Sequence, residues 1–231
     1  MPIVLVSGAN RGLGLEFCRQ YAAAGWHTIA TCRQPDRAPA LQALADSHAN
    51  LEIHALDVAD CAGIDRLAAQ LSGLAIDVLL NNAGVYGDNS GNGFGSLDYE
   101  QWQRVLRINS LGPVKMAEAF IDHVQRSERK LIVAVTSLMG SMADNGSGGS
   151  LMYRSSKAAL NASVRSLALD LRPRRVGLLL VHPGWVRTDM GGMEAPLSVE
   201  ASVNGMRCLI ENFDLRHSGD FVDYLGKPLP W

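Results

Sequence analysis

Short apolar runs recur along the chain, separated by longer segments in which apolar positions return every three or four residues. The apolar runs predict strands over residues 3–7, 28–32, 51–55, 78–81, 131–136 and 176–181, with a short edge strand near 221–222. Their apolar density is typical of strands covered on both faces, as in a parallel sheet. The amphipathic segments predict helices over residues 14–24, 64–71, 101–120, 155–171 and 199–213.

The alternation of strand and helix indicates βαβ units and an α/β fold. We expect a doubly wound parallel sheet of the Rossmann type, with helices on both faces. No repeat or linker divides the 231 residues, so the chain is predicted to form one domain over 1–231. Two loops rich in Gly, Ser and Asn, at 87–96 and 141–150, are either active-site flaps or surface connections.

The composition of the chain mainly excludes certain classes of partner and binding site. Charged residues make up 19% and the net charge is −2, so nothing in the charge favours nucleic acid or an anionic membrane as a partner. No apolar run approaches the ~18 residues that span a bilayer. The four cysteines lack C-x-x-C spacing and no histidine pair has metal-ligand spacing, which predicts free thiols, no metal site and a cytoplasmic location.

The first predicted strand runs into Ser-Gly-Ala-Asn-Arg-Gly-Leu-Gly at residues 7–14, where the first helix opens. Three glycines there permit a tight turn and a close backbone approach to a pyrophosphate, while the helix N-terminus offers amide donors. A glycine-rich turn without a ligand is the alternative. The residues expected to contact a nucleotide cofactor here are Gly8, Asn10, Arg11, Gly12, Leu13 and Gly14.

The end of the second predicted strand distinguishes between two cofactors. NAD-binding folds usually place an acid there for the ribose 2′-hydroxyl. This chain has Cys32 followed by Arg33, and no Asp or Glu lies between His27 and Gln34. Arg33 and Arg11 suit a 2′-phosphate, although either could simply be solvated. The pattern therefore favours NADP(H) over NAD.

Tyr153 and Lys157 lie four residues apart on a predicted helix, so their side chains leave on the same face. A nearby ammonium group is expected to lower the pKa of the phenol, which is about 10 in an unperturbed tyrosine, toward the range useful for general acid–base catalysis. Taken alone, the pair also fits a half-buried tyrosine beside a solvated lysine.

Further motifs occur in an order that resembles the short-chain dehydrogenase/reductase family over nearly the whole chain. They are the glycine turn, Leu56-Asp57-Val58, Asn81-Asn82-Ala83-Gly84, Asn109 in Arg-Ile-Asn-Ser-Leu-Gly, Ser137 in Val-Thr-Ser-Leu-Met-Gly, Tyr153/Lys157, and Pro183-Gly184 followed by Thr188. Within the family, residues 25–27, 142–145, 182–192 and 229–231 resemble the C-factor and sniffer-type carbonyl reductases.

The resemblance implies a role for each matching residue. Asp57 and Val58 would lie beside the adenine. The chain at the end of the fourth strand would line the adenosine ribose, through Asn82, Ala83 and Gly84. The nicotinamide carboxamide would be held by Pro183, Gly184, Val186 and Thr188. The catalytic residues would be Asn109, Ser137, Tyr153 and Lys157. Ser137 would bind the substrate carbonyl, Tyr153 would exchange the proton, Lys157 would hold the nicotinamide ribose, and Asn109 would anchor a water.

The expected function is NADP-dependent reduction of a ketone or aldehyde, with Tyr153 as the proton donor and a small carbonyl compound as the substrate. Two alternatives stay open. One is a cofactor-binding signalling or scaffold protein of the C-factor type with incidental turnover, and the other is an NADP-linked alcohol dehydrogenase working in the oxidative direction. Association as a homodimer or homotetramer through the helices predicted at 101–120 and 155–171 is also possible.

Overall fold

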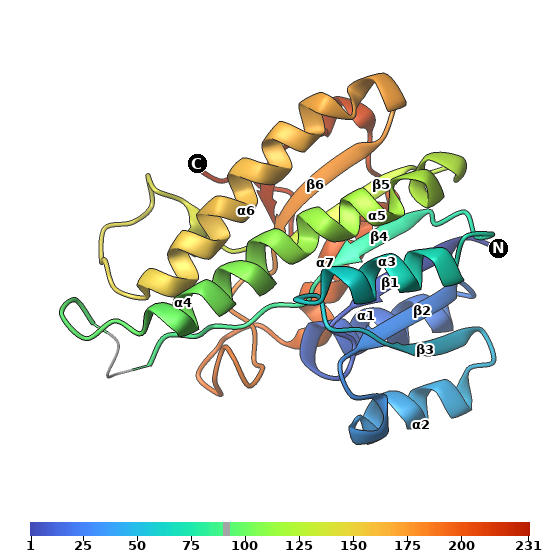
Figure 1. The fold of residues 1–231 in the computed structure, drawn as a ribbon, viewed down its shortest axis with the longest axis horizontal. Coiled ribbons are helices and arrows are strands. Elements are labelled where there is room, and N and C mark those ends of the chain that lie inside the picture. The colour runs from blue at the N-terminus through green and yellow to red at the C-terminus, as the bar shows by residue number, and fades with distance from the viewer. Residues whose placement is uncertain (90–92) are drawn as a thin grey trace.

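Seven parallel strands form the centre of the structure, a computed structural model in which residues 1–89 and 93–231 are described (Figure 1). The strands are β1 (Ile3–Ser7), β2 (His27–Cys32), β3 (Leu51–Ala55), β4 (Val78–Asn81), β5 (Leu131–Val135), β6 (Gly177–His182) and β7 (Phe221–Asp223). Their order in the sheet is β3-β2-β1-β4-β5-β6-β7. The predicted doubly wound parallel sheet is therefore confirmed, with each predicted strand within one residue of its place at either end.

The strands are buried on both faces because their side chains alternate between two separate apolar layers. In β1, Val4 and Val6 enter one layer and Leu5 enters the other, and all three are fully buried. Leu5 aligns with Ile29 of β2 and Leu79 of β4, which face the same layer. This two-sided burial explains the nearly continuous apolar runs in the sequence.

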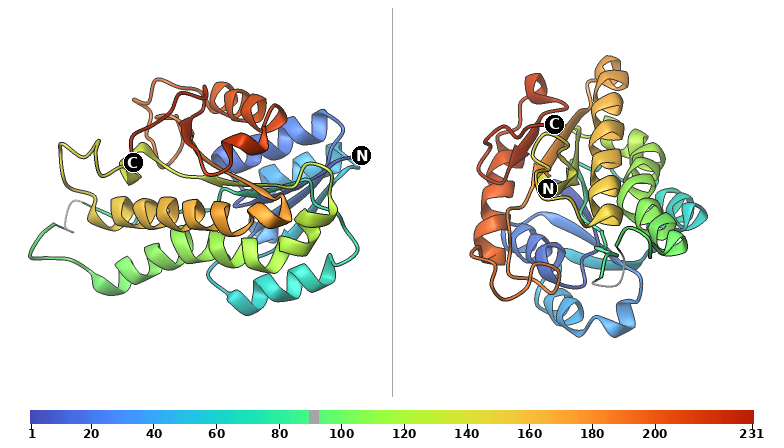
Figure 2. Two further views of the ribbon diagram at one scale, coloured as in Figure 1. Left: turned by 90° about the horizontal axis from the view of Figure 1, so that it is seen from above. Right: turned by 90° about the vertical axis from the view of Figure 1, so that its left-hand side faces the viewer.

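Helices cover both faces of the sheet (Figure 2). One face carries α1 (Gly12–Ala23), α2 (Pro39–Ser47) and α7 (Val199–Glu211), and the other carries α3 (Cys61–Gln70), α5 (Gly112–Arg126) and α6 (Leu151–Asp170). Helix α4 (Tyr99–Leu106) packs against α6. Helix α2 was not predicted; it has nine residues, and Leu41 is its one buried side chain.

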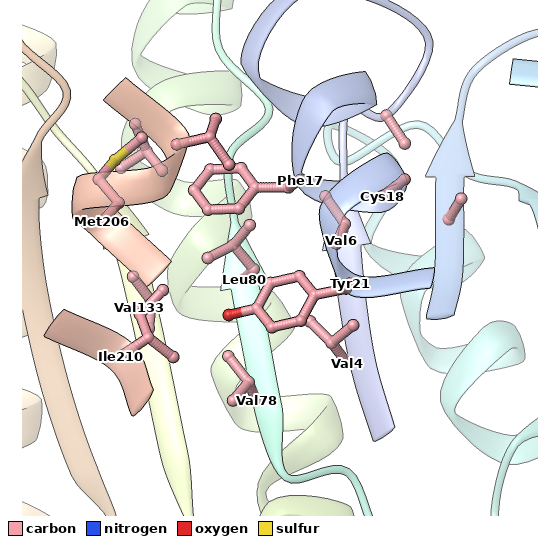
Figure 3. Close-up of a cluster of buried hydrophobic side chains, with 14 of the residues drawn as sticks. Val4, Val6, Phe17, Cys18, Tyr21, Val78, Leu80, Val133, Met206 and Ile210 are labelled. Carbon is pink, nitrogen blue, oxygen red and sulfur yellow. The ribbon is translucent and has the colours of Figure 1, made fainter. Parts of the chain in front are cut away.

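The layer beneath α1 and α7 contains the larger aromatic side chains (Figure 3). Phe17 and Tyr21 of α1 lie over β1 and β4, and Met206 and Ile210 of α7 close the layer beside them. The guanidinium group of Arg207 lies 4.7 Å from the centre of the Tyr21 ring. These contacts hold α1, and with it the glycine turn, firmly on the sheet.

Residues 101–120 are helical throughout, as predicted, but the helical stretch runs over 99–126 and contains an unexpected π-helical turn. The structure has α4, then a π-helical turn over Arg107–Leu111, then α5. At this turn the Gly112 amide donates to the Arg107 carbonyl, which adds one residue to the helical repeat. A Cβ on Gly112 would lie 2.8 Å from the Val58 carbonyl oxygen, so the turn also allows a close backbone contact. The extra residue does not interrupt the apolar periodicity, and the sequence pattern therefore does not reveal it.

The two loops predicted from composition differ in how far they can be followed. Part of 87–96 lies outside the described residues. The loop 141–150 is irregular, and it is tied to the end of the chain because the Ala143 amide and the Ser141 hydroxyl both donate to the Trp231 carbonyl. None of the described helices is both long and apolar enough to cross a membrane.

Candidate active site

A cleft of about 480 Å³ opens at the carboxyl ends of the central strands. Its walls come from the turns after β1, β2, β3, β4 and β6, from the end of β5, and from the first two turns of α6. The chain crosses the sheet in opposite directions from β1 to β2 and from β3 to β4, which leaves a crevice between the strand ends beside β1 and β4. The topology thus gathers into one cleft residues that are far apart in the sequence.

The glycine turn leaves room only for backbone at two points. A Cβ on Gly8 would lie 2.8 Å from the Ala83 Cα, and a Cβ on Gly14 would lie 2.1 Å from the Gly8 carbonyl oxygen. Gly8 and Gly12 both have positive φ angles, which glycine adopts without strain. No side chain caps the N-terminus of α1, and no acidic residue stands in its first turn. The turn can therefore accept an anionic group close to the backbone.

Ser7 and Asn82 join the turn to the end of β4. The Ser7 hydroxyl accepts hydrogen bonds from the Asn82 and Ala83 amides, each at 3.1 Å. The Asn82 side chain donates to the carbonyls of Ser7 and Gly8, at 2.9 and 3.2 Å. Asn82 lines the cleft as expected, but its amide group is engaged in holding the glycine turn in place.

Arginines stand at two separate places along the cleft. Arg33 is exposed directly after β2 and lines the cleft together with Asp57 and Val58. Arg11 forms an ion pair with Asp189, which follows β6 on the opposite wall. Arg33 thus lies at the end of the cleft near β2 because of its position in the chain. The guanidinium group of Arg11 points instead toward Asp189.

Tyr153 and Lys157 line the cleft near the end of β5, and Ser137 lies beside Tyr153 without being among the lining residues. Tyr153 and Lys157 occupy one face of α6 and are only 8% and 4% exposed. Ser137, which follows β5, interacts with the Tyr153 phenol through its side chain. Its oxygen also accepts a hydrogen bond from the Met139 amide at 3.1 Å, so its own proton is free to be donated.

The electrostatics of Tyr153 differ from the expectation. Burial raises the pKa of Tyr153 to about 12, the hydrogen bond with Ser137 opposes this rise, and Tyr86 adds to it. Lys157 is not among the groups that shift this pKa, and its Nζ lies 5.8 Å from the centre of the phenol ring. The expected lowering of this pKa by Lys157 is therefore not found in the protein alone, where desolvation of the phenol has the largest effect.

Lys157 is itself changed by its surroundings. Burial lowers the pKa of Lys157 to about 8, and its Nζ donates to the Val135 carbonyl at 2.9 Å. His182, at the end of β6, has a pKa lowered by burial to about 4 and is therefore neutral at neutral pH. Lys157 is thus mostly charged at neutral pH but close to losing its proton.

Asn109 lies in the π-helical turn and is completely buried. Its Oδ1 accepts from the Val85 amide at 2.9 Å, while its Nδ2 donates to the Val85 carbonyl and to the Ser156 hydroxyl. A Cβ on Gly84 would lie 3.4 Å from the Asn109 Oδ1 and 3.7 Å from the Lys157 Nζ. Asn109 is thus close to Lys157, but both amide protons of its side chain are already used, and its expected role in holding a water stays a prediction.

The cleft includes most of the expected cofactor residues. Those that line it are Gly8, Asn10, Arg11, Gly12, Leu13, Gly14, Arg33, Asp57, Val58, Asn82, Ala83, Gly84, Tyr153, Lys157, Pro183 and Thr188. Gly184 and Val186 are not among the lining residues. A Cβ on Gly184 would lie 2.8 Å from the Leu197 side chain, and Val186 forms a β-bridge with Leu197. These two residues shape the chain after β6.

Several lining residues were not expected from the sequence. Among them are Arg187, Asp189 and Met190, which follow β6, and Val199 at the start of α7. The nearby Pro183-Gly184 motif indicated that the chain after β6 lines the cleft. The motif does not indicate how many of the residues that follow it also line the cleft. Among the described residues, no group of three His, Cys, Asp or Glu side chains could hold a metal ion.

A doubly wound parallel sheet with a glycine-lined cleft beside its first strand defines a nucleotide-binding α/β protein. A sequence model of the short chain dehydrogenase family matches residues 2–196. The chain therefore belongs to the short-chain dehydrogenase family, an oxidoreductase family.

Three proteins that are similar to this chain have more specific descriptions than the family model. The C-signal of Myxococcus xanthus is 46% identical over 156 residues, which cover 68% of this chain and 93% of that protein. The structure of the carbonyl reductase Sniffer of D. melanogaster has a TM-score of 0.92 and 33% identity and covers both chains completely. The NADPH-bound carbonyl reductase from chicken fatty liver has a TM-score of 0.91 and 34% identity, again over both complete chains.

Proposed function

We propose that this protein uses NADPH to reduce a ketone or aldehyde, with Tyr153 as the proton donor. The observation that carries the proposal is a buried, protonated phenol beside the Ser137 hydroxyl, at one end of a cleft whose other end has an exposed arginine. The family and the carbonyl reductase structures with the same fold support it.

The cleft fits a dinucleotide phosphate in shape and chemistry. The glycine turn would hold the pyrophosphate, because its closely packed backbone excludes side chains there. Arg33 stands where an acid would bind the 2′-hydroxyl of NAD, so it would contact a 2′-phosphate. The similar chicken reductase is an NADPH-bound structure, which agrees with this choice of cofactor.

When bound, the nicotinamide would supply the hydride. Ser137 would donate a hydrogen bond to the substrate carbonyl oxygen, because its own oxygen already accepts from Met139. Tyr153 would transfer its phenolic proton to the same oxygen as negative charge develops, which completes the alcohol. Lys157 would attract the resulting phenolate and hold the ribose hydroxyls, and solvent would return the proton.

The protonated state of Tyr153 agrees with its proposed role as the proton donor. With a pKa raised by burial to about 12, the phenol keeps its proton at neutral pH and can donate it. Oxidation of an alcohol would require the phenolate as the base, which the same burial disfavours. Because oxidation and reduction pass through the same transition state, an NADP-linked alcohol dehydrogenase working in the oxidative direction stays the alternative.

The purified protein is expected to consume NADPH with at least one class in a panel of aldehydes, ketones, dicarbonyls and quinones, each tested as a small molecule. Absorbance at the NADPH band, with product analysis for the alcohol, measures it. A control without protein removes the spontaneous reaction of quinones and dicarbonyls. A protein that binds NADPH but reduces nothing in the panel would contradict the proposal.

Arg33→Asp is expected to weaken NADPH binding by roughly tenfold or more, because a guanidinium–phosphate contact is replaced by charge repulsion. NADH binding should be unchanged or tighter, since the new carboxylate can accept from the ribose 2′-hydroxyl. Fluorescence titration with both cofactors measures the change. Arg37→Asp, in the 3₁₀ helix just after Arg33, is the matched control and should leave the NADPH preference intact. Unchanged selectivity in Arg33→Asp would show that another group binds the phosphate.

One observation favours a second function, namely signalling, because the C-signal of Myxococcus xanthus is 46% identical over the part that it shares with this chain. Under this reading the cleft binds the nucleotide, and reduction is incidental. The carbonyl panel separates the two proposals: efficient turnover supports the reductase, whereas tight NADPH binding without turnover supports signalling. Association as a homodimer or homotetramer, and a cytoplasmic location, stay predictions.

A further inference from the structure

Helix α6, which carries Tyr153 and Lys157, begins without a capping side chain at Ser150, the residue directly before it. Gly148, Gly149 and Ser150 enter it in the left-handed conformation, with φ angles of 65°, 69° and 48°. Ser150 occupies the cap position, but its side chain makes no capping hydrogen bond to the helix. Its hydroxyl is instead 2.7 Å from the Tyr86 hydroxyl. The first amides of the helix therefore need an acceptor from elsewhere.

Asp88 provides that acceptor from the segment after β4. Its Oδ2 accepts from the Tyr153 amide at 2.8 Å, and its Oδ1 accepts from the Met152 amide at 3.2 Å. The carboxylate thus binds the second and third amides of α6, the positions that a local cap usually serves. Its negative charge also lies at the positive end of the helix dipole. One of the two amides belongs to Tyr153 itself.

The backbone next to Asp88 has a conformation that brings Asp88 to the start of α6. Gly87 has a φ angle of +82°, and a Cβ there would lie 2.2 Å from the Val105 side chain, so only glycine fits. On its other side, Tyr86 places its ring 4.9 Å from the Tyr153 ring. Tyr86 and Asp88 therefore contact the same first turn of α6 from either side of this glycine.

We propose that Asp88 is a positioning residue for carbonyl reduction, which holds the start of α6 so that the Tyr153 phenol stays in line with Ser137 in the cleft. The inference rests on the proposed function. Asp88 is 65 positions from Tyr153 in the sequence and acts on its backbone amide, so it affects the reaction only through the position of the tyrosine.

Asp88→Ala should lower kcat by roughly 10–100-fold, because a small displacement of a catalytic group is enough for such a loss. The dissociation constant of NADPH should stay within about twofold, since most of the cleft is formed by other segments. Asp88→Asn keeps one acceptor oxygen and should recover part of kcat. Hydrogen exchange at the Met152 and Tyr153 amides should be about fivefold faster in Asp88→Ala, as expected when a helix cap is lost.

Asp214→Ala is the matched control, because Asp214 also accepts from a backbone amide, that of Arg216, at the same distance of 2.8 Å. It caps a short 3₁₀ helix before β7. Because the effect of Asp88 is specific to α6, we expect kcat and the exchange rate at the Tyr153 amide to equal the wild-type values in this variant. Wild-type kcat in Asp88→Ala, in a protein that reduces carbonyls, would overturn the proposal. If the wild type reduces no carbonyl, the proposed function fails, and the exchange rates alone decide whether Asp88 holds the helix.

Discussion

Tyr153→Phe is expected to lower kcat for carbonyl reduction by roughly 10²–10⁴-fold, the usual contribution of a positioned general acid. The ring remains, so its contact with Tyr86 and the burial of the site are retained. Only the proton and the interaction with Ser137 are lost. Steady-state kinetics with the best substrate of the panel measure the loss, and fluorescence titration should show that NADPH still binds.

The control is Tyr99→Phe, because Tyr99 is a 65% exposed tyrosine at the start of α4 and does not line the cleft. It removes the same hydroxyl group and should keep wild-type kinetics. A Tyr153→Phe enzyme that reduces the same substrate at a rate close to that of the wild type would mean that another group, or water, donates the proton.

Gly14→Ala is expected to disrupt the cofactor turn. The added Cβ would lie 2.1 Å from the Gly8 carbonyl oxygen and 2.6 Å from the Asn82 Nδ2. The Gly8 carbonyl belongs to the backbone, so it cannot move away without displacing the turn. We expect a loss of about 1–3 kcal/mol in the free energy of unfolding, typical of overpacking at a tight contact. NADPH binding should weaken by at least about tenfold, because the backbone that would hold the pyrophosphate is displaced.

Urea unfolding and cofactor titration measure the two effects. Gly73→Ala is the matched control, since no atom lies within 4 Å of its Cβ position, and it should change neither quantity much. A Gly14→Ala variant with wild-type stability and NADPH binding would show that the turn can relax around a methyl group, and that its glycine is not required for close packing.

The strands and the glycine turn were predictable because their signals are local. A strand buried on both faces must be apolar at consecutive positions, as in Leu131–Val135. A turn that leads from β1 into α1 needs residues without side chains where backbones meet, and Gly8 and Gly14 are spaced accordingly. The topology then follows from the strand–helix alternation, because parallel strands require crossovers.

The parts that were missed depend on contacts between distant segments. The π-helical turn that buries Asn109 adds one residue without changing the apolar pattern. Helix α2 buries too little apolar surface to stand out. The capping of α6 by Asp88 joins residues that are separated in the sequence by α4, α5 and β5, and no local motif indicates it.

The sequence by itself determined the sheet, the nucleotide-binding turn, the family resemblance, and the pairing of Tyr153 with Lys157 on one helix face. These follow from periodicity and spacing, which are properties of neighbouring residues. Only the tertiary structure decided the protonation of that pair. Because both side chains are buried where the helix meets the sheet, desolvation raises the pKa of Tyr153 and lowers that of Lys157. The sequence shows which groups stand together, whereas burial determines which of them holds a proton.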